Sequence, residues 1–305
     1  EHSARLRLVH VLDPAGCKPL RDWFTPSIDI DLKASQARES LRRFAVEIAG
    51  RYDVTTSVEV AVGEPLETLM QASERAELLV LGRRGLYPFK PPLVGRIADR
   101  TLRTCRRPVL VVKAPVERAY RCVLVPVDFT ASSEAAVQVA ARLTRSSGLH
   151  VFHAIDSRRE AVLRDADVPE HVIRESRLRQ EAGASARMRR MAARLGLDRT
   201  GMDFMAAHGP AVRSTLRHAQ WLGADLIVAG KQGRSTLGRF LLGSVSSRIL
   251  SGANCDMLIV PRPRDEARAC ADNAVLARNA AALAGSLTPA QWPERAERFE
   301  SGRVA

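Results

Sequence analysis

Short apolar runs alternate with amphipathic stretches along most of the chain. Residues 6–12 and 58–62 are apolar runs that end in a Pro or Gly turn, which is typical of strands. Between them, the apolar positions of residues 31–49 recur with a helical period. The pattern continues with strands at 78–81 and 109–112 and helices at 66–74 and 97–102. Strands that alternate with helices predict an α/β fold built on a parallel, doubly wound sheet.

The second part of the chain repeats this order of elements at a constant offset. Three glycines, Gly230, Gly233 and Gly243, each follow an earlier glycine by 148 residues. The earlier glycines are Gly82, Gly85 and Gly95. A constant interval at several positions indicates a tandem duplication, so we expect two domains of the same architecture.

The two copies, residues 1–115 and 119–262, differ at their beginnings. The second copy opens with an apolar strand that ends at Asp128, followed by a helix over residues 132–146. The first copy has no such strand and helix. Residues 263–305 form an Ala/Arg/Glu-rich tail, which we expect to be weakly helical or disordered.

Residues 225–247 combine a buried strand, a glycine turn, a loop and the start of a helix. After the strand the sequence reads Gly, two residues, Gly, nine residues, Gly-Ser. Glycines allow backbone N–H groups to approach an anion closely, and a helix start offers further N–H donors. This layout favours phosphate binding, although a tight turn and a helix cap would give the same residues. The residues concerned are Gly230, Gly233, Gly243 and Ser244.

This spacing resembles the universal stress protein family, whose ATP-binding members carry the same glycines followed by Ser or Thr. The four residues Gly230, Gly233, Gly243 and Ser244 match at every position. The resemblance covers about residues 1–262. It implies two flavodoxin-like, or Rossmann-like, units in tandem with five-stranded parallel sheets, and ATP, with Mg²⁺, bound in the second copy.

The resemblance also implies roles for residues outside the glycine motif. The first-strand Asp of the family contacts adenine, and here that residue is Asp128, with Pro126 beside it. Ala154 stands at the position that lines the base pocket, and Val245 follows Ser244 along the phosphate and ribose region. From the residues alone, Asp128 has an alternative role, because a strand-end Asp also caps helices or accepts from loop amides.

Basic residues in or beside the loop also have two possible roles. Lys231, Arg234 and Arg239 are placed to neutralise phosphate charge, or else they are simply solvated. In the first copy, Arg96 stands at the Ser/Thr position, and prolines stiffen the loop before it. Arg96 could pair with a phosphate, block the site or face solvent. We interpret the first copy as a degenerate, structural partner.

The family fold places its first strand in the middle of the sheet. Without that strand the first copy would leave two neighbouring strands unpaired. We therefore expect residues upstream of Glu1, or, as the alternative, a strand donated by another chain. The resemblance further implies that the last strands of the two copies, 109–112 and 257–260, pair as an internal pseudo-dimer, with a homodimer as a further possibility.

Composition disfavours several other classes of protein. The five cysteines are scattered and odd in number, which fits a reduced cytoplasm and disfavours zinc and disulfide frameworks. No run approaches the ~18 apolar residues of a membrane span. The net charge of +13 comes mainly from Arg residues that alternate with Glu and Asp along helices. We interpret them as solvated helix faces rather than a nucleic-acid surface.

No catalytic constellation accompanies the glycine motif. His10 and His153 lie within expected strands, and His208 precedes a turn with no metal ligand or triad partner next to it. We therefore predict no catalytic residues and no protein metal site, and at most slow ATP hydrolysis. The sequence favours a cytoplasmic, nucleotide-dependent module for stress signalling. Two alternatives stay open, namely a nucleotide-free interaction scaffold of the same fold and a basic nucleic-acid-binding protein.

Overall fold

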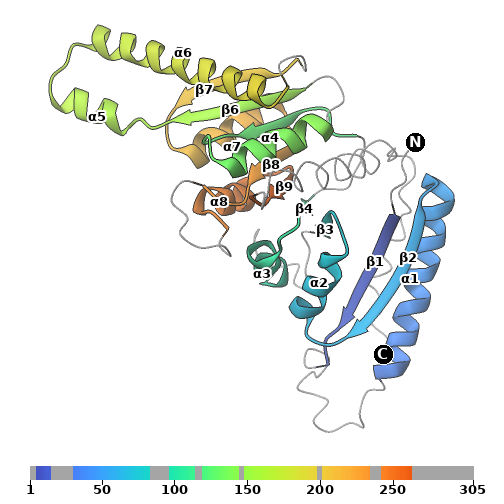
Figure 1. Cartoon of the computed structure of the whole chain (residues 1–305). Coiled ribbons are helices and arrows are strands. Elements are labelled where there is room, and N and C mark those ends of the chain that lie inside the picture. The colour runs from blue at the N-terminus through green and yellow to red at the C-terminus, as the bar shows by residue number, and fades with distance from the viewer. Residues whose placement is uncertain are drawn as a thin grey trace.

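The computed structural model (Figure 1) describes residues 5–14, 30–82, 96–113, 119–143, 148–197, 201–233 and 242–262. Over these residues helices and strands alternate, and all strand pairs but one are parallel. The predicted α/β class with two copies in tandem is confirmed. The predicted helical tendency of the tail lies outside the described residues.

The second copy forms one continuous sheet of five parallel strands. Their order is β9-β8-β5-β6-β7. The first strand of the copy in the sequence, β5, lies in the middle of the sheet. Its residues Val123, Leu124 and Val125 are fully buried. The strands are β5 (Val123–Pro126), β6 (Leu149–Ile155), β7 (Asp203–His208), β8 (Leu226–Gly230) and β9 (Asp256–Val260).

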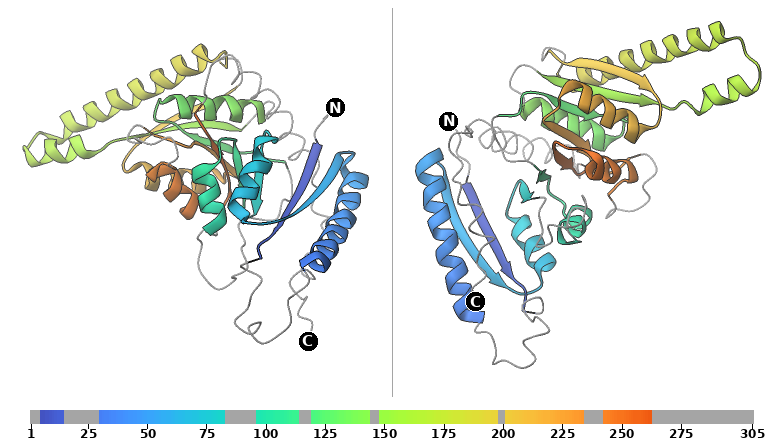
Figure 2. Two further views of the ribbon diagram at one scale, coloured as in Figure 1. Left: turned by 60° about the horizontal axis from the view of Figure 1, so that its bottom comes forward. Right: turned by 180° about the vertical axis from the view of Figure 1, so that it is seen from behind.

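Helices cover both faces of this sheet (Figure 2). Because successive strand residues point to opposite faces, Val123 and Val125 pack with α4 and α6, whereas Leu124 packs with α7 and α8. Each face therefore has its own apolar core. The helices are α4 (Ala131–Leu143), α5 (Arg158–Asp165), α6 (Glu170–Arg194), α7 (Ala211–Leu222) and α8 (Ser244–Gly252).

The strand order places a topological switch point beside β5. From β5 the chain moves outward through β6 and β7, and α7 then carries it back to β8 on the other side of β5. In open α/β sheets, ligands bind in the crevice that forms at the carboxyl ends of the strands where the order reverses.

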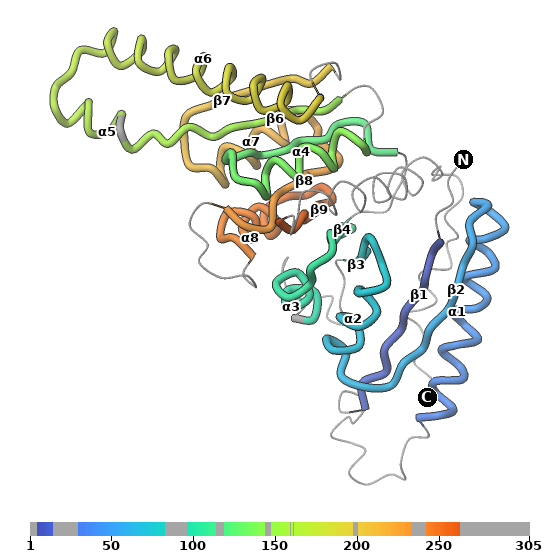
Figure 3. Tube along the Cα trace, in the orientation of Figure 1, coloured from blue at the N-terminus to red at the C-terminus, as the bar shows by residue number. Residues whose placement is uncertain are grey.

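The first copy is split between two sheets (Figures 1 and 3). Its strands β1 and β2 pair only with each other, whereas β3 and β4 extend the sheet of the second copy to seven strands. No described strand lies between β1 and β3. The elements are β1 (Arg5–Leu12), α1 (Ile30–Tyr52), β2 (Thr55–Val62), α2 (Pro65–Glu74), β3 (Leu79–Gly82), α3 (Arg96–Thr104) and β4 (Val109–Val112).

The two copies join through their last strands, as the family resemblance implied. β4 runs antiparallel to β9, with Val109 opposite Ile259 and Leu110 opposite Leu258. The Nζ of Lys113 donates to the backbone oxygens of Leu250, at 2.5 Å, and Ala253, at 2.8 Å. These bonds fix the first copy to the end of α8.

None of the described helices combines the length and the apolar character that a bilayer crossing requires.

Candidate functional site

The carboxyl ends of β5, β6 and β8 bring the predicted site residues to one place. Pro126 is two residues after Leu124 on β5, and Ala154 is two residues after Phe152 on β6, so both point to the face covered by α7 and α8. The helix that begins at Ser244 lies on that same face.

The glycines of the motif are needed for close approach. A Cβ at Gly230 would lie 2.8 Å from the carbonyl carbon of Ser132, at the start of α4. A Cβ at Gly233 would lie 3.1 Å from Oδ2 of Asp128. Only a residue without a side chain fits such positions without movement of its neighbours. The glycine turn is thus pressed against the end of β5 and the first turn of α4.

The second half of the motif closes on the first. The backbone N–H of Gly243 donates to the carbonyl of Lys231 at 2.8 Å, and a Cβ at Gly243 would lie 3.5 Å from the nitrogen of Gly233. The loop residues 234–241 between them, including Arg234 and Arg239, lie outside the described residues. The structure therefore brings Gly243 against Lys231 and Gly233.

Helix α8 begins at the motif with its first turn open. Gly243 is the N-cap, and no side chain caps the helix. Ser244 is exposed as the first helical residue, so it is not the cap that the sequence suggested, and Val245 is 41% exposed. The first N–H groups of a helix have no intrahelical partner and carry the positive end of its dipole. This end of the site can accept an anion.

Ser246 is a site residue that the sequence analysis missed. Its hydroxyl donates to the carbonyl of Gly230 at 2.8 Å and so ties the first turn of α8 to the end of β8. A Ser at the third position of a helix gives no signal in the sequence that would distinguish it from a solvent-exposed residue.

Asp128 combines a structural contact with an oxygen that faces the glycine turn. Its Oδ1 accepts from the N–H of Thr130 at 3.1 Å and from its hydroxyl at 2.6 Å. This is the loop-amide role that was weighed against base contact. Its other oxygen, Oδ2, is the atom nearest to the Cβ position of Gly233.

Lys231 contradicts the expectation of a phosphate-neutralising or solvated side chain. It is only 5% exposed, and its Nζ donates to the carbonyl of Cys105 in the first copy at 2.6 Å. Burial, helped by nearby Arg106, lowers the pKa of Lys231 to about 8. The side chain turns away from the glycine loop because the packing of the two copies provides it with an acceptor.

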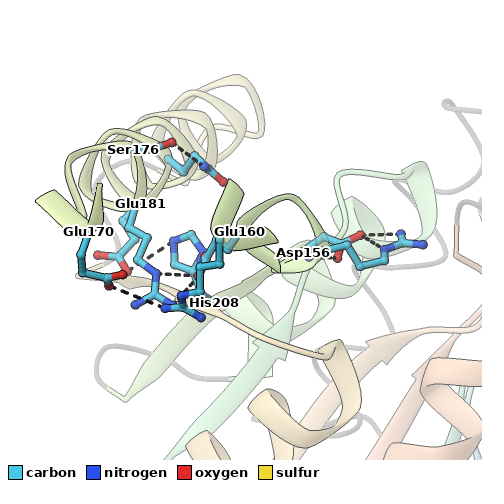
Figure 4. Close-up of polar contacts among 10 residues, drawn as sticks. Asp156, Glu160, Glu170, Ser176, Glu181 and His208 are labelled. Atoms are coloured by element: carbon cyan, nitrogen blue, oxygen red, sulfur yellow. Dashed lines mark hydrogen bonds and ion pairs between the residues drawn. The ribbon is translucent and has the colours of Figure 1, made fainter. Parts of the chain in front are cut away.

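His208, the last residue of the edge strand β7, belongs to a buried network of charged side chains (Figure 4). Glu160 of α5 contacts both Arg177 of α6, whose Nε donates at 2.7 Å, and Nδ1 of His208. Nε2 of His208 lies 3.6 Å from Glu181. The hydrogen bond from Arg177 lowers the pKa of Glu160 against the opposing effect of burial, and His208 adds to the lowering.

This network fixes α5 and α6 to the end of β7. His208 lies opposite Ile155, the last residue of β6, and Ala154 lies one residue before it. The network therefore supports the strand end that carries the base-pocket position rather than forming a metal centre. Within the described ranges, no cluster of three or more His, Cys, Asp or Glu side chains is arranged to hold a metal ion.

In the described part of the first copy, the glycine that corresponds to Gly230 has no close neighbour. A Cβ at Gly82, the counterpart of Gly230, would meet no atom within 4 Å. Gly85 and Gly95 lie outside the described residues, and Arg96 is the first residue of α3.

Comparisons with known proteins agree with this architecture. Residues 1–113 and 119–261 match the model of a family described as the universal stress protein family. A universal stress protein of Mycolicibacterium smegmatis is 26% identical over 279 residues, covering 86% of this chain and 89% of that protein. Universal stress protein A homolog 2 of Coxiella burnetii is 31% identical over 121 residues, covering 38% of this chain and 75% of that protein.

A solved structure shows the same fold. The crystal structure of a universal stress protein from Archaeoglobus fulgidus superposes with a TM-score of 0.59 at 21% identity. The superposition covers 85% of this chain and 88% of that one.

Proposed function

Because the chain belongs to the universal stress protein family, we propose that its second copy binds ATP, with Mg²⁺, at the carboxyl ends of β5, β6 and β8. The observation that carries the proposal is the contact of both halves of the glycine motif with each other and with the end of β5. Gly243 bonds to Lys231, and Gly233 lies against Asp128.

Each part of the site has a role in this proposal. The N–H groups of the first turn of α8 would hold the phosphates, together with the Ser244 hydroxyl, and the glycine turn would let the phosphates approach closely. Val245 would border the ribose. Pro126, Ala154 and the Oδ2 of Asp128 would border the base. Mg²⁺ is commonly bound through substrate phosphates and water, so it would enter with the nucleotide.

The biological role that fits this site is a cytoplasmic, nucleotide-dependent module for stress signalling. The proposal assigns no catalytic residue, and turnover would be slow at most. Bound ATP would change the surface around α8 that a protein partner meets, while the first copy acts as the fixed structural partner.

Thermal unfolding of the full chain with and without Mg²⁺ and ATP tests the proposal. A ligand that binds only the folded state raises the unfolding midpoint. We expect this rise in the wild type and its loss in Gly243→Asp, because a carboxylate at the helix start repels phosphate. Gly243→Ala is the matched control. Its methyl group makes only close van der Waals contact, so it should keep most of the rise.

The opposite result would favour a different function. A well-folded wild type whose midpoint does not change with ATP would contradict nucleotide binding. The interaction scaffold of the same fold would then be the better reading.

A further inference from the structure

A surface pocket lies between the start of α4 and the carboxyl-terminal half of α6, on the sheet face opposite to α7 and α8. Its volume is about 350 Å³. It is lined by Phe129, Glu134, Arg187, Arg190, Met191 and Arg194. We call it the arginine pocket. Nothing in the proposed ATP site uses these side chains.

The arginine pocket carries more positive charge than its own residues neutralise. Three guanidinium groups meet one carboxylate there, and that carboxylate, Glu134, pairs with Arg194. Within the described part of the chain, Arg187 and Arg190 form no ion pair. The spacing of Arg187, Arg190 and Arg194 along α6 places all three on one side of the helix. Such a concentration of like charge is relieved by a bound anion.

One guanidinium is held in place. The central carbon of Arg187 lies 3.9 Å from the ring centre of Phe129, which is the geometry of a cation–π contact. Phe129 itself is in the left-handed region, with φ at 62°, which is rare for a bulky residue. Its ring centre also lies 4.7 Å from that of His153. The N–H groups of a guanidinium in such a contact can still bind oxygens.

The floor of the pocket is apolar and buried. Met191 is 2% exposed and belongs to the core that α4 and α6 share. Charge-assisted hydrogen bonds gain strength beside such a low-dielectric surface. Paired N–H groups of arginine match the oxygen spacing of phosphate, which a single lysine ammonium does not.

We propose that the arginine pocket is a second anion site that binds the phosphate group of a small phosphorylated molecule. Phe129 directly follows Asp128 in the chain, so a ligand here contacts the residue next to the proposed base pocket. The binding itself does not depend on the ATP proposal.

Calorimetric titration of inorganic phosphate into the full chain, at constant ionic strength, tests the pocket. Gly243→Asp serves as the background, because phosphate at the glycine motif is repelled there. We expect this background to retain saturable phosphate binding. Adding Arg190→Gln should weaken it by about tenfold or more, the usual effect of losing a charged hydrogen-bond donor. Arg187→Gln should act in the same direction.

A matched control removes equal charge elsewhere on α6. The single variant Arg174→Gln lies outside the pocket and should bind phosphate as its background does. Circular dichroism verifies that each variant is folded. As a second measurement, wild-type chain saturated with ATP should still bind phosphate.

Two results would overturn the second site. If Arg190→Gln and Arg187→Gln bind phosphate as tightly as their background, the pocket is not where phosphate binds. If Gly243→Asp alone abolishes all phosphate binding while folded, the anion binds only at the glycine motif. That second result would leave the ATP proposal intact, whereas failure of ATP binding would leave the phosphate result readable.

Discussion

The two copies contain counterpart residues 148 positions apart, and these counterparts have different environments. Val228 of β8 is fully buried, whereas Val80 of β3 is 44% exposed. Gly230 lies against Ser132, whereas Gly82 faces open space. Both differences arise at the place of β5, which separates β6 from β8 in the second copy and has no described counterpart between β1 and β3. Among the described residues, the glycine turn of the second copy therefore packs against the start of α4, and Gly82 of the first copy has no such neighbour.

Two reciprocal hydrogen bonds join the first copy to the second. Cys105 and Ala253 are counterparts at the ends of α3 and α8, and each accepts a hydrogen bond from a lysine of the other copy. Lys113 provides one bond and Lys231 the other. Cations near helix carboxyl ends also interact favourably with the helix dipole. The two copies are therefore held together at the ends of both helices.

The largest effect on stability should come from shortening the side chain of Val228, the buried member of the pair Val228 and Val80. Val228→Ala removes fully buried methyl groups and leaves a cavity, so it should lower the free energy of unfolding by about 2 to 3 kcal/mol. Val80→Ala removes the same atoms from a half-exposed site and should cost less than about 1 kcal/mol. Urea unfolding followed by circular dichroism measures both. Equal losses would show that β3 is packed as tightly as β8.

The glycine counterparts give a second, smaller contrast. Gly230→Ala forces a methyl group against the backbone of Ser132, so we expect a loss of about 1 to 2 kcal/mol. Gly82→Ala meets open space and should change stability by less than about 0.5 kcal/mol. The same urea measurement applies. A costly Gly82→Ala would mean that a wall does face this glycine.

The sequence was sufficient for the features that depend on local pattern. Short apolar runs predicted the strands, and the constant offset predicted the duplication. The glycine spacing identified the two segments of the motif, which contact each other in the structure. Helix α6 was missed because its 25 residues are polar on most sides, with only Ile173, Met188, Met191 and Ala192 buried.

Contacts between distant segments could not be predicted in this way. The burial of Lys231 depends on where α3 of the other copy ends. The network of Glu160, Arg177 and His208 depends on the packing of α5 and α6 against the end of β7. In both cases the residue type alone suggested a solvated or isolated side chain.

The smallest predicted effect concerns the pH dependence of the contact between the copies. Lys231 has a folded pKa of about 8, below its ordinary value of 10.5. Between these values the unfolded chain binds more protons, so the contribution of Lys231 to stability rises with pH. From pH 8 to 9, the stability of the wild type relative to Lys231→Met should rise by up to about 1 kcal/mol.

Urea unfolding of both proteins at each pH measures this difference. Higher pH is avoided, because burial raises the pKa of Cys255 to about 11 and that of Tyr120 as well, and these groups oppose the rise. A relative stability that stays flat or falls would show that Lys231 remains charged in its buried position.

The number of ATP molecules bound per chain tests the contrast between the copies most directly. Isothermal titration calorimetry of Mg²⁺ and ATP into the full chain should give one site per chain. Gly230→Ala should weaken that site, and Gly82→Ala should leave it unchanged. Two equivalent sites, or a single site that is weakened by Gly82→Ala and not by Gly230→Ala, would contradict the account.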